Sequence, residues 1–515
     1  MTLWGKVIDQ GKCIGCHACT IACKSEHQVP LGVTRTYVKQ VEVGTYPSVQ
    51  RHFQVTRCNQ CEDAPCAAIC PVTAMYRRPD GIVDFDRDAC IGCKACMAAC
   101  PYDAIYIDPV SHSAEKCNFC AHRIDQGLEP ACVAVCPERA IIVGDLADPE
   151  SEVSRLVATG KVAVRKPEKE TNPKLFYLDA SDFTRVPGLA ALPPIHATAE
   201  QHERYPPEPD LLLELLVREG GFANTRRPAR EPRSTAAAAV LQYDVPHGAP
   251  WDWRVSAYTW TKSVAAGAYL VPALLAWFGA GLGAGVELAA TAVALLFLGL
   301  TGALLIADLA HPERFWRILV RPRWNSWLAR GAYVITAYGA LLAMDLLGRL
   351  AGWQGLVVGL RVPGAILGTL TAIYTAFLFA QAKARDLWQN PLLPIHLLVQ
   401  ALVAGAAAVL LLAIASGVEA GPALLWGLAG GAAAHVAVVL SELTIPHGTR
   451  DAARAAWHLT RGTYARLFWG GLALAAAAAF AAGAGWGASG AMLALAGLLA
   501  YEHAYVQAGQ SVPLS

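Results

Sequence analysis

The sequence predicts an α+β domain at its N-terminal end, a linker, and an all-α membrane domain of eight helices. Three observations lead to this fold class. All sixteen cysteines lie within the first 136 residues, residues 181–250 are rich in Pro, Arg and Glu, and the chain from Trp251 onward is mainly apolar. The hydrophobic content of 54% exceeds that of an ordinary soluble protein, and a net charge of +1 argues against a nucleic-acid partner.

The cysteines fall into four blocks of four. The blocks are Cys13, Cys16, Cys19 and Cys23; Cys58, Cys61, Cys66 and Cys70; Cys90, Cys93, Cys96 and Cys100; and Cys117, Cys120, Cys132 and Cys136. The first and third blocks have the spacing Cys-x-x-Cys-x-x-Cys-x-x-x-Cys, which is the ligand run of a cubane iron–sulfur cluster. Three cysteines on one tight loop reach one cube, and the fourth points to a second cube. Sixteen thiolates therefore predict four [4Fe–4S] clusters and an α+β ferredoxin-like domain.

Two other uses of the cysteines are less favoured. A disulfide scaffold is typical of secreted chains, whereas the first ten residues, MTLWGKVIDQ, show no apolar signal-peptide core. A structural zinc site closes with four ligands, usually two Cys-x-x-Cys pairs, and has no use for the third and fourth cysteine of each run. Iron–sulfur clusters remain the expected occupants.

The pattern resembles the four-cluster ferredoxin subunit of molybdopterin oxidoreductases, the family of the dimethyl sulfoxide and polysulfide reductase electron-transfer subunits. The resemblance covers roughly residues 1–180 and includes the long gap from Cys120 to Cys132. It implies that block one pairs with block four, and block two with block three. The implied ligand sets are Cys13, Cys16, Cys19 and Cys136; Cys117, Cys120, Cys132 and Cys23; Cys58, Cys61, Cys66 and Cys100; and Cys90, Cys93, Cys96 and Cys70.

Domain boundaries follow from the composition. We expect a four-cluster ferredoxin domain over 1–180, with short strands such as 81–85 and 140–143 beside the cysteine loops. Residues 181–250 are expected to form an extended linker, and 251–515 the membrane domain.

Eight apolar stretches are long enough, or nearly so, to span about 30 Å of hydrocarbon. They are 258–283, 288–308, 331–348, 362–382, 391–415, 421–441, 466–484 and 487–506. Loops on the side of the ferredoxin domain hold eleven Arg or Lys residues, and the opposite loops hold only Arg349 and Arg361. The positive-inside rule therefore favours a bacterial cytoplasmic (inner) membrane protein with the ferredoxin domain on the cytoplasmic face. A periplasmic face stays open as the alternative, because relatives of this architecture occur there.

The membrane half resembles the NrfD/PsrC-like polysulfide reductase membrane subunits, a family of eight-helix quinone-reactive proteins. The matching segments are IADLAHPERFW at 306–316, SWLARGA at 326–332, IYTAFL at 373–378, WQNPLLP at 388–394 and QAGQSVPLS at 507–515. The resemblance implies a quinone contact at Tyr374 in the fourth helix. Further candidates for this site are Tyr258, Trp260, Lys262, Asp308 and Arg314.

Other ionisable residues in the apolar half have structural explanations. Lys262 is also expected to snorkel towards the interface, and Asp308 with Arg314 could form an ion pair that closes a helix end. Glu287, Asp345, Glu442 and Glu502 are expected at helix ends near the interface. His396 and His435 could together hold a haem, but no haem is expected, because the resembled family carries none and buried histidines are usually packed and hydrogen bonded.

The expected function is that of an electron-transfer and membrane-anchor subunit of a respiratory complex. It would exchange electrons between ubiquinone or menaquinone in the membrane and a separate molybdopterin-containing catalytic subunit, with no substrate-reducing site of its own. Two alternatives stay open: a redox-driven proton or ion pump, and a plain anchor without a quinone site. The terminal substrate and the direction of electron flow leave no signal in the sequence.

Overall fold

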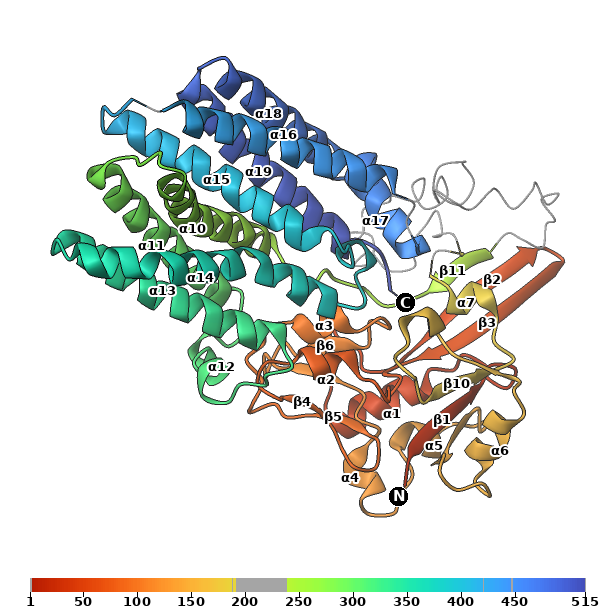
Figure 1. Cartoon of the computed structure of the whole chain (residues 1–515). Helices are drawn as coiled ribbons and strands as arrows, with labels where there is room; N and C mark the ends of the chain where they lie inside the picture. Colours follow the sequence, from red (N-terminus) through yellow and green to blue (C-terminus); the bar gives the residue numbers. More distant parts are fainter. Residues whose placement is uncertain (1, 188, 191–238, 420, 446–447, 515) are drawn as a thin grey trace. The chain divides into compact units, whose positions relative to one another are not determined.

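The computed structural model describes residues 2–187, 189–190, 239–419, 421–445 and 448–514 (Figure 1). These residues form two compact units. The first comprises the chain up to Pro250 with Ala382–Ala384 and Val512–Ser515, and the second comprises Trp251–Gln381 and Arg385–Ser511. Most of the predicted linker, 191–238, lies outside the described residues.

A four-stranded sheet joins the two ends of the cysteine-rich region. Its strand order is β8 (Ile141–Asp145), β1 (Trp4–Asp9), β10 (Leu175–Leu178) and β9 (Val162–Ala163). β1 pairs in parallel with β10 and antiparallel with β8, which places β1 inside the sheet with Val7 and Ile8 fully buried. The strand expected at 140–143 is part of β8.

A second sheet is a long hairpin with one added strand. β2 (Tyr37–Thr45) pairs with β3 (Ser48–Thr56) on one side and with β11 (Ala239–Tyr243) on the other. Both β11 and the short helix α7 (Asp182–Arg185) fall in the range predicted as linker. The described ends of that range are therefore secondary structure of the first unit.

Short helices and two small hairpins surround the cysteines. The helices are α1 (Ala18–His27), α2 (Pro65–Ile69), α3 (Ala95–Ala99), α4 (Ala121–Ile124), α5 (Ala131–Ala134) and α6 (Glu152–Ala158). The hairpins pair β4 (Met75–Arg77) with β5 (Val83–Phe85), and β6 (Ile105–Ile107) with β7 (Ala114–Lys116), so the strand expected at 81–85 is present as β5. His17 and Lys94, which occupy equivalent places in blocks one and three, both adopt left-handed φ angles of 60° and 59° before α1 and α3. The same cysteine spacing thus produces the same sharp turn.

Eight helices of 19 residues or more form the described part of the second unit. They are α10 (Trp253–Trp277), α11 (Ala284–Ala307), α13 (Trp327–Leu350), α14 (Gln354–Gln381), α15 (Leu393–Ala415), α16 (Pro422–Thr444), α18 (Ala465–Gly483) and α19 (Gly487–Gln510). Six of them, all except α10 and α19, are long and apolar enough to cross a membrane. The largest difference from the predicted ranges is at α14, which starts before the predicted 362 and continues through Pro363.

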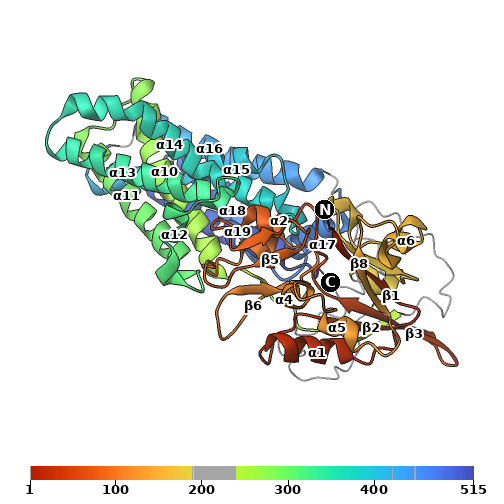
Figure 2. The same ribbon diagram turned by 90° about the horizontal axis from the view of Figure 1, so that it is seen from below.

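Two shorter helices, α12 (Arg317–Val320) and α17 (Arg450–Thr460), lie in the connections between long helices. The long helices run side by side in both ribbon views (Figures 1 and 2), and α10 packs against α11, α14, α15 and α19. α10 therefore links the first four long helices to the last four.

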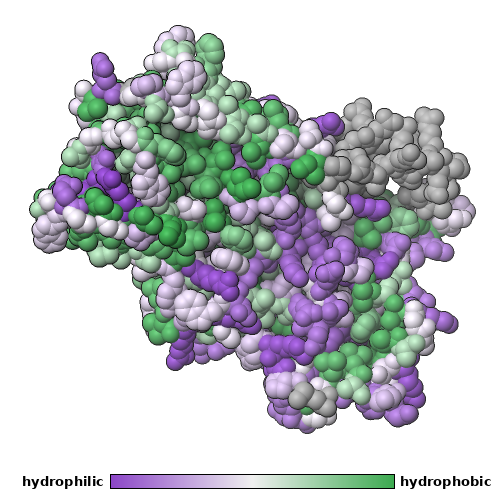
Figure 3. All heavy atoms as spheres, in the orientation of Figure 1, coloured by the Kyte–Doolittle hydropathy of each residue, from purple (hydrophilic) through white to green (hydrophobic). Residues whose placement is uncertain are grey.

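Glycines permit the closest helix contact. A Cβ atom on Gly267 of α10 would lie 1.8 Å from the carbonyl oxygen of Ala401, and one on Gly405 of α15 would lie 2.1 Å from Gly267 itself. The two backbones touch here, as small residues allow in membrane bundles. On the outside, large apolar side chains such as Leu347, Val358 and Ile366 are exposed, and apolar residues gather on the visible surface of the long helices (Figure 3).

Candidate cluster-binding and membrane sites

The first set of four cysteines, site 1, lines a cavity beside α1. It comprises Cys13, Cys16, Cys19 and Cys136. Three come from the loop and first turn of α1, the fourth follows α5, and Val38, Val55 and Ile141 of the two sheets close the cavity. Cys16 is exposed and Cys13 and Cys136 are half-buried, so site 1 is the most accessible of the four sets.

Two further cavities are lined in the same way. Site 2 comprises Cys58, Cys61, Cys66 and Cys100, all buried, together with Tyr102 and Lys116. Site 3 comprises Cys70, Cys90, Cys93 and Cys96. Backbone amides of Gly92 and Ala114 each donate to Cys90 Sγ at 3.4 Å. Such donors stabilise negative charge on sulfur.

The remaining four cysteines, site 4, are Cys23, Cys117, Cys120 and Cys132, and all are buried. Burial, and then the neighbouring Cys117 thiol, raise the pKa of Cys23 to about 12 and that of Cys120 to about 11. His27 Nε2 of α1 lies 3.2 Å from Cys120 Sγ. The cysteines that line the cavities at sites 1–3 are thus the same sets of four that the family resemblance implies. Site 4 consists of the four cysteines that line none of these three cavities.

The chemistry of these donors fits an iron–sulfur cluster. Burial raises the pKa of Cys61 to about 12 and that of Cys100 to about 11, so these thiols need a positive partner to act as thiolates. Zinc would draw four sulfurs to about 2.3 Å from one ion. In the described residues, no three His, Cys, Asp or Glu side chains converge closely enough to hold a single metal ion. Four cysteines around one cavity fit a cubane [4Fe–4S] cluster, because each cysteine binds a different iron at a corner of the cube and the sulfurs stay apart.

Buried cations lie beside the cysteines. Arg57, which is 1% exposed, donates from Nη1 to Cys132 Sγ at 2.8 Å. Burial raises the pKa of Cys132, but the positive charges of Arg57 and Lys6 together lower it by more, so the pKa lies below its usual value. Lys116, also fully buried, donates from Nζ to the Val83 carbonyl and to the Cys117 carbonyl at 3.3 Å. Sites 2 and 4 are therefore bordered by fixed positive charge.

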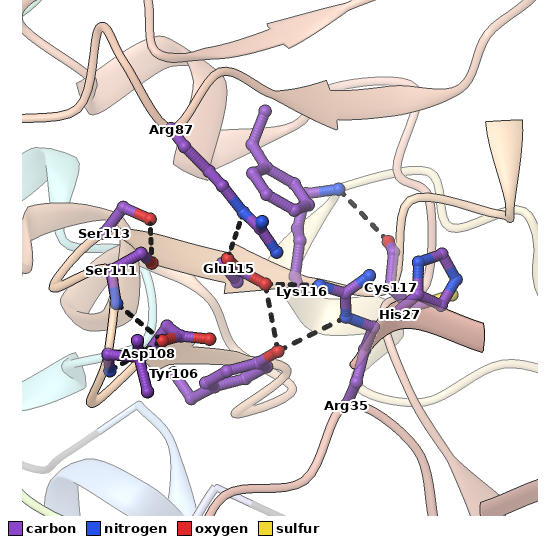
Figure 4. A network of polar contacts seen from close by, with 12 residues as sticks. His27, Arg35, Arg87, Tyr106, Asp108, Ser111, Ser113, Glu115, Lys116 and Cys117 are labelled. Atoms are coloured by element: carbon purple, nitrogen blue, oxygen red, sulfur yellow. Dashed lines mark hydrogen bonds and ion pairs between the residues drawn. The ribbon is translucent and has the colours of Figure 1, made fainter. Parts of the chain in front are cut away.

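A buried ion cluster holds the strand that precedes Cys117 (Figure 4). Glu115 of β7 is fully buried and accepts hydrogen bonds from Arg35 and, at 3.2 Å, from the Tyr106 hydroxyl. Its other carboxylate oxygen forms an ion pair with Arg87. Arg35 Nε also donates to the Tyr106 hydroxyl at 3.3 Å. A buried carboxylate is tolerated only when paired in this way, so the cluster positions β7 and with it Cys117.

In the second unit, Tyr374 and three side chains around it form one buried cluster. Lys262 of α10 is fully buried and donates from Nζ to the Ala372 carbonyl at 2.9 Å and to Thr375 Oγ1 at 2.8 Å. Its Nζ lies 5.2 Å from the centre of the Tyr374 ring. Thr375 lies beside the hydroxyl groups of both Tyr258 and Tyr374. The expectation that Lys262 snorkels is wrong, because its ammonium group is bonded inside the bundle.

The other three candidates are placed differently. Trp260 donates from Nε1 to the Leu495 carbonyl at 3.0 Å and packs on Phe297, so it belongs to the contact of α10 with α11 and α19. Asp308, the residue after α11, is buried and close enough to Tyr258 to act on its hydroxyl electrostatically. Arg314 is one-quarter exposed, with its Nε 3.7 Å from Glu313.

Sequence reasoning missed several partners of this cluster. Glu502 of α19 was expected at the interface but is 3% exposed, and Ser263 donates to its Oε1 at 3.5 Å. Outside this cluster, Asp345 was also expected at the interface but is fully buried, where it accepts from Thr291 at 2.9 Å and from Arg349 at 2.7 Å. Gly331 of α13 lies against Tyr374, since a Cβ there would be 2.5 Å from the ring. Gly331 had a signal in the sequence as part of the segment at 326–332, whereas Glu502 and Asp345 stood out as charges in the apolar half but were assigned to the interface.

The fold and these sites define an iron–sulfur electron-transfer protein with a multi-pass membrane domain. Residues 49–146 match the 4Fe-4S dicluster domain family, and residues 243–484 match the family described as polysulphide reductase, NrfD.

Proteins similar to the first part of the sequence are components of reductases. A polypeptide of the polysulfide reductase of Wolinella succinogenes is 45% identical over 179 residues, which are 34% of this chain and 92% of that protein. A subunit of the tetrathionate reductase of Salmonella typhimurium is 40% identical over 195 residues, 37% of this chain and 78% of that protein. The arsenate respiratory reductase iron-sulfur subunit of Shewanella is 35% identical over 222 residues, 34% of this chain and 95% of that protein. The protein belongs to this family of iron–sulfur subunits and carries an NrfD domain fused to it.

Proposed function

We propose that this chain passes electrons between a membrane quinone and a separate molybdopterin-containing catalytic subunit through four [4Fe–4S] clusters. The observation that carries the proposal is that three cavities are each lined by four cysteines, in a chain that holds four further buried cysteines and a buried Lys262–Tyr374 cluster. The names of the relatives, all of them components of reductases, support a catalytic partner. Sites 1–4 are the proposed ligand sets.

The residues around Tyr374 have the chemistry that a quinone carbonyl needs. An ammonium group has three donors, and two of those of Lys262 are used by Ala372 and Thr375. The third donor and the Tyr374 hydroxyl could bind and orient the quinone oxygens in an apolar pocket. The clusters, when bound, supply the one-electron chemistry. This chain's residues hold the quinone, exclude water and accept its protons.

The proposed topology has eight spans. α10 and α19 complete the six apolar helices, because both pack inside the bundle with most of their residues buried. The excess of Arg and Lys in the loops on one side supports placing the first unit on the cytoplasmic face of a bacterial inner membrane. The domains are proposed as 1–180, 181–250 and 251–515.

The test is quinol-dependent reduction of the clusters in the purified complex, followed by electron paramagnetic resonance. Four clusters require sixteen iron atoms per chain. Tyr374→Phe and Lys262→Ala are expected to slow cluster reduction at least tenfold while leaving the iron content unchanged. Trp260→Phe, at a half-buried aromatic residue outside the cluster, is the control and should stay near the unmodified rate. Unchanged rates in both test variants would support a plain anchor instead.

A further inference from the structure

A second buried polar cluster of the membrane unit lies between α15, α16 and α19. His396 and Gln400 of α15 are 1% and 2% exposed, and His435 of α16 is 0% exposed. Tyr501 of α19 packs against both imidazole rings, with ring centroids 5.3 Å and 4.9 Å away. None of these residues belongs to the Lys262–Tyr374 cluster.

Hydrogen bonds determine which nitrogens of this cluster carry protons. Asn390 Nδ2 donates to Glu442 Oε1 at 2.7 Å, and His396 Nδ1 lies 3.3 Å from the same oxygen. His396 Nδ1–H therefore donates to the Glu442 carboxylate, which leaves His396 Nε2 as an acceptor. That nitrogen receives a hydrogen bond from Gln400 Nε2 at 3.3 Å. It also lies 3.0 Å from His435 Nδ1, which must then carry a proton.

This assignment leaves His435 Nε2 as a bare acceptor. Among the described residues it has no hydrogen-bond partner, and it is buried from solvent. Buried polar atoms are nearly always paired, so an unpaired imidazole nitrogen inside an apolar bundle calls for an explanation. The direct 3.0 Å contact between the rings also argues against a haem iron between the two histidines.

We propose that His435, His396 and Glu442 form a proton relay for the protons of the quinone reaction. The proposal rests on the proposed function, because it takes its protons from quinol bound at Lys262 and Tyr374. A quinol gives two electrons to the clusters and releases two protons, which need a path through the bundle.

The transfer balances along the observed bonds. A proton arrives at His435 Nε2, and the Nδ1 proton of the same ring passes to His396 Nε2. The Nδ1 proton of His396 then passes to Glu442 Oε1. One proton enters at His435, one leaves as the Glu442 carboxylic acid, and no electron moves.

The relay has a buried entry and a partly exposed exit. Glu442 lies in the last turn of α16 and its side chain is 11% exposed, whereas His435 lies seven residues further in. Seven helical residues span about 10 Å, roughly a third of the hydrocarbon thickness. The relay therefore covers one end of the bundle.

Helix α19 connects the relay to the Lys262–Tyr374 cluster. Tyr501 packs on the histidines, and the next residue, Glu502, accepts from Ser263 beside Lys262. Consecutive helical residues differ by about 1.5 Å in height, so the two clusters lie at the same level. Glu502 Oε2 is likewise buried without a hydrogen-bond partner in the described structure. In the proposed path this carboxyl carries the quinol proton from the Lys262–Tyr374 cluster towards His435.

The first experiment follows both products of quinol oxidation in proteoliposomes that contain the complete complex. A quinol analogue is added, cluster reduction is read from absorbance, and proton release from a pH-sensitive dye. His435→Gln is expected to slow proton release at least tenfold while the first cluster is still reduced. His503→Gln, at a partly exposed histidine of α19, is the control and should release protons at the unmodified rate. Unchanged proton release in His435→Gln would overturn the relay.

The second experiment needs no quinol. A pH step is applied to the oxidised complex, and the imidazole and carboxyl bands are followed by infrared difference spectroscopy. His435→Gln should remove a protonation band that His503→Gln keeps. Glu442→Gln should do the same at the partly exposed end of the relay, where a substitution disturbs the packing less. Bands that remain in both variants contradict the relay. Absence of cluster reduction by quinol in the unmodified complex would instead contradict the proposed function.

Discussion

Arg57 is the buried cation between two sets of cysteines. It donates to Cys132 of site 4. Burial lowers the pKa of Arg57, but the thiols of Cys132, Cys19 and Cys117 raise it further. Cys19 is a member of site 1, so one guanidinium group serves both sites. Because a reduced cluster carries one more negative charge than an oxidised one, such a cation stabilises the reduced form.

Arg57→Gln is expected to lower the midpoint potentials of the clusters at sites 1 and 4. A hydrogen bond to a charged group contributes about 1.5–3 kcal/mol, which for one electron corresponds to roughly 60–130 mV. Redox titration followed by electron paramagnetic resonance measures the shift. Arg57→Lys, which keeps the charge, should shift the potentials less, and Arg51→Gln, at an exposed arginine of β3, should leave them unchanged. Four unaltered potentials in Arg57→Gln, with full iron content, would contradict this role.

His247 is expected to make the β11 segment sensitive to pH. Burial lowers the pKa of His247, but the carboxylates of Asp244 and Asp103 have the larger effect and raise the pKa to about 10. Since the unfolded value is about 6.5, the stabilisation is complete below that pH and is lost as pH rises towards 10. The protection of β11 amides from exchange, taken relative to the intrinsic exchange rate at each pH, should therefore be lower at pH 9 than at pH 6. His247→Gln should remove most of this difference, whereas His52→Gln on β3 should retain it.

At the scale of elements, the contact of α10 with α15 depends on two glycines. Gly267→Ala would place a Cβ 1.8 Å from the Ala401 carbonyl oxygen, so the helices must separate. Overpacking of this kind costs about 1–3 kcal/mol or more. Thermal unfolding in detergent should occur at a lower temperature in Gly267→Ala.

The matched control is Gly299→Ala on α11. A Cβ there meets nothing within 4 Å, and alanine is the better helix former by about 1 kcal/mol. This variant should be as stable as the unmodified protein or slightly more so. Equal behaviour of the two variants would mean that the α10–α15 contact does not limit stability.

At the scale of the whole molecule, one chain combines two units that are stabilised in different ways. In the first unit, buried ion pairs such as Arg35 with Glu115 and the bonds of thiolates to iron, when bound, hold short elements that have little apolar core of their own. In the second, long helices pack through small residues and expose apolar side chains outward. Fusion keeps the proposed cluster chain and quinone site in a fixed one-to-one ratio.

The sequence by itself determined the two units and the identity of the sixteen cysteines. Both signals are local patterns in the sequence. The spacing of the cysteines reflects the sharp turn they form, as at His17 and Lys94. The length of an apolar stretch reflects the helix it forms. The sequence also identified two candidates for the quinone site. Tyr374 was identified through the matching segment at 373–378, and Lys262 as a charged residue in an apolar stretch.

Only the tertiary structure decided which polar groups meet. Glu502, Asp345 and His435 lie far from their partners in the sequence, and whether a carboxylate faces the interface or the bundle interior depends on how helices rotate against each other. The same holds for β11, whose pairing with β2 joins residues almost two hundred positions apart. Contacts of this kind arise from packing between elements, which no local pattern encodes.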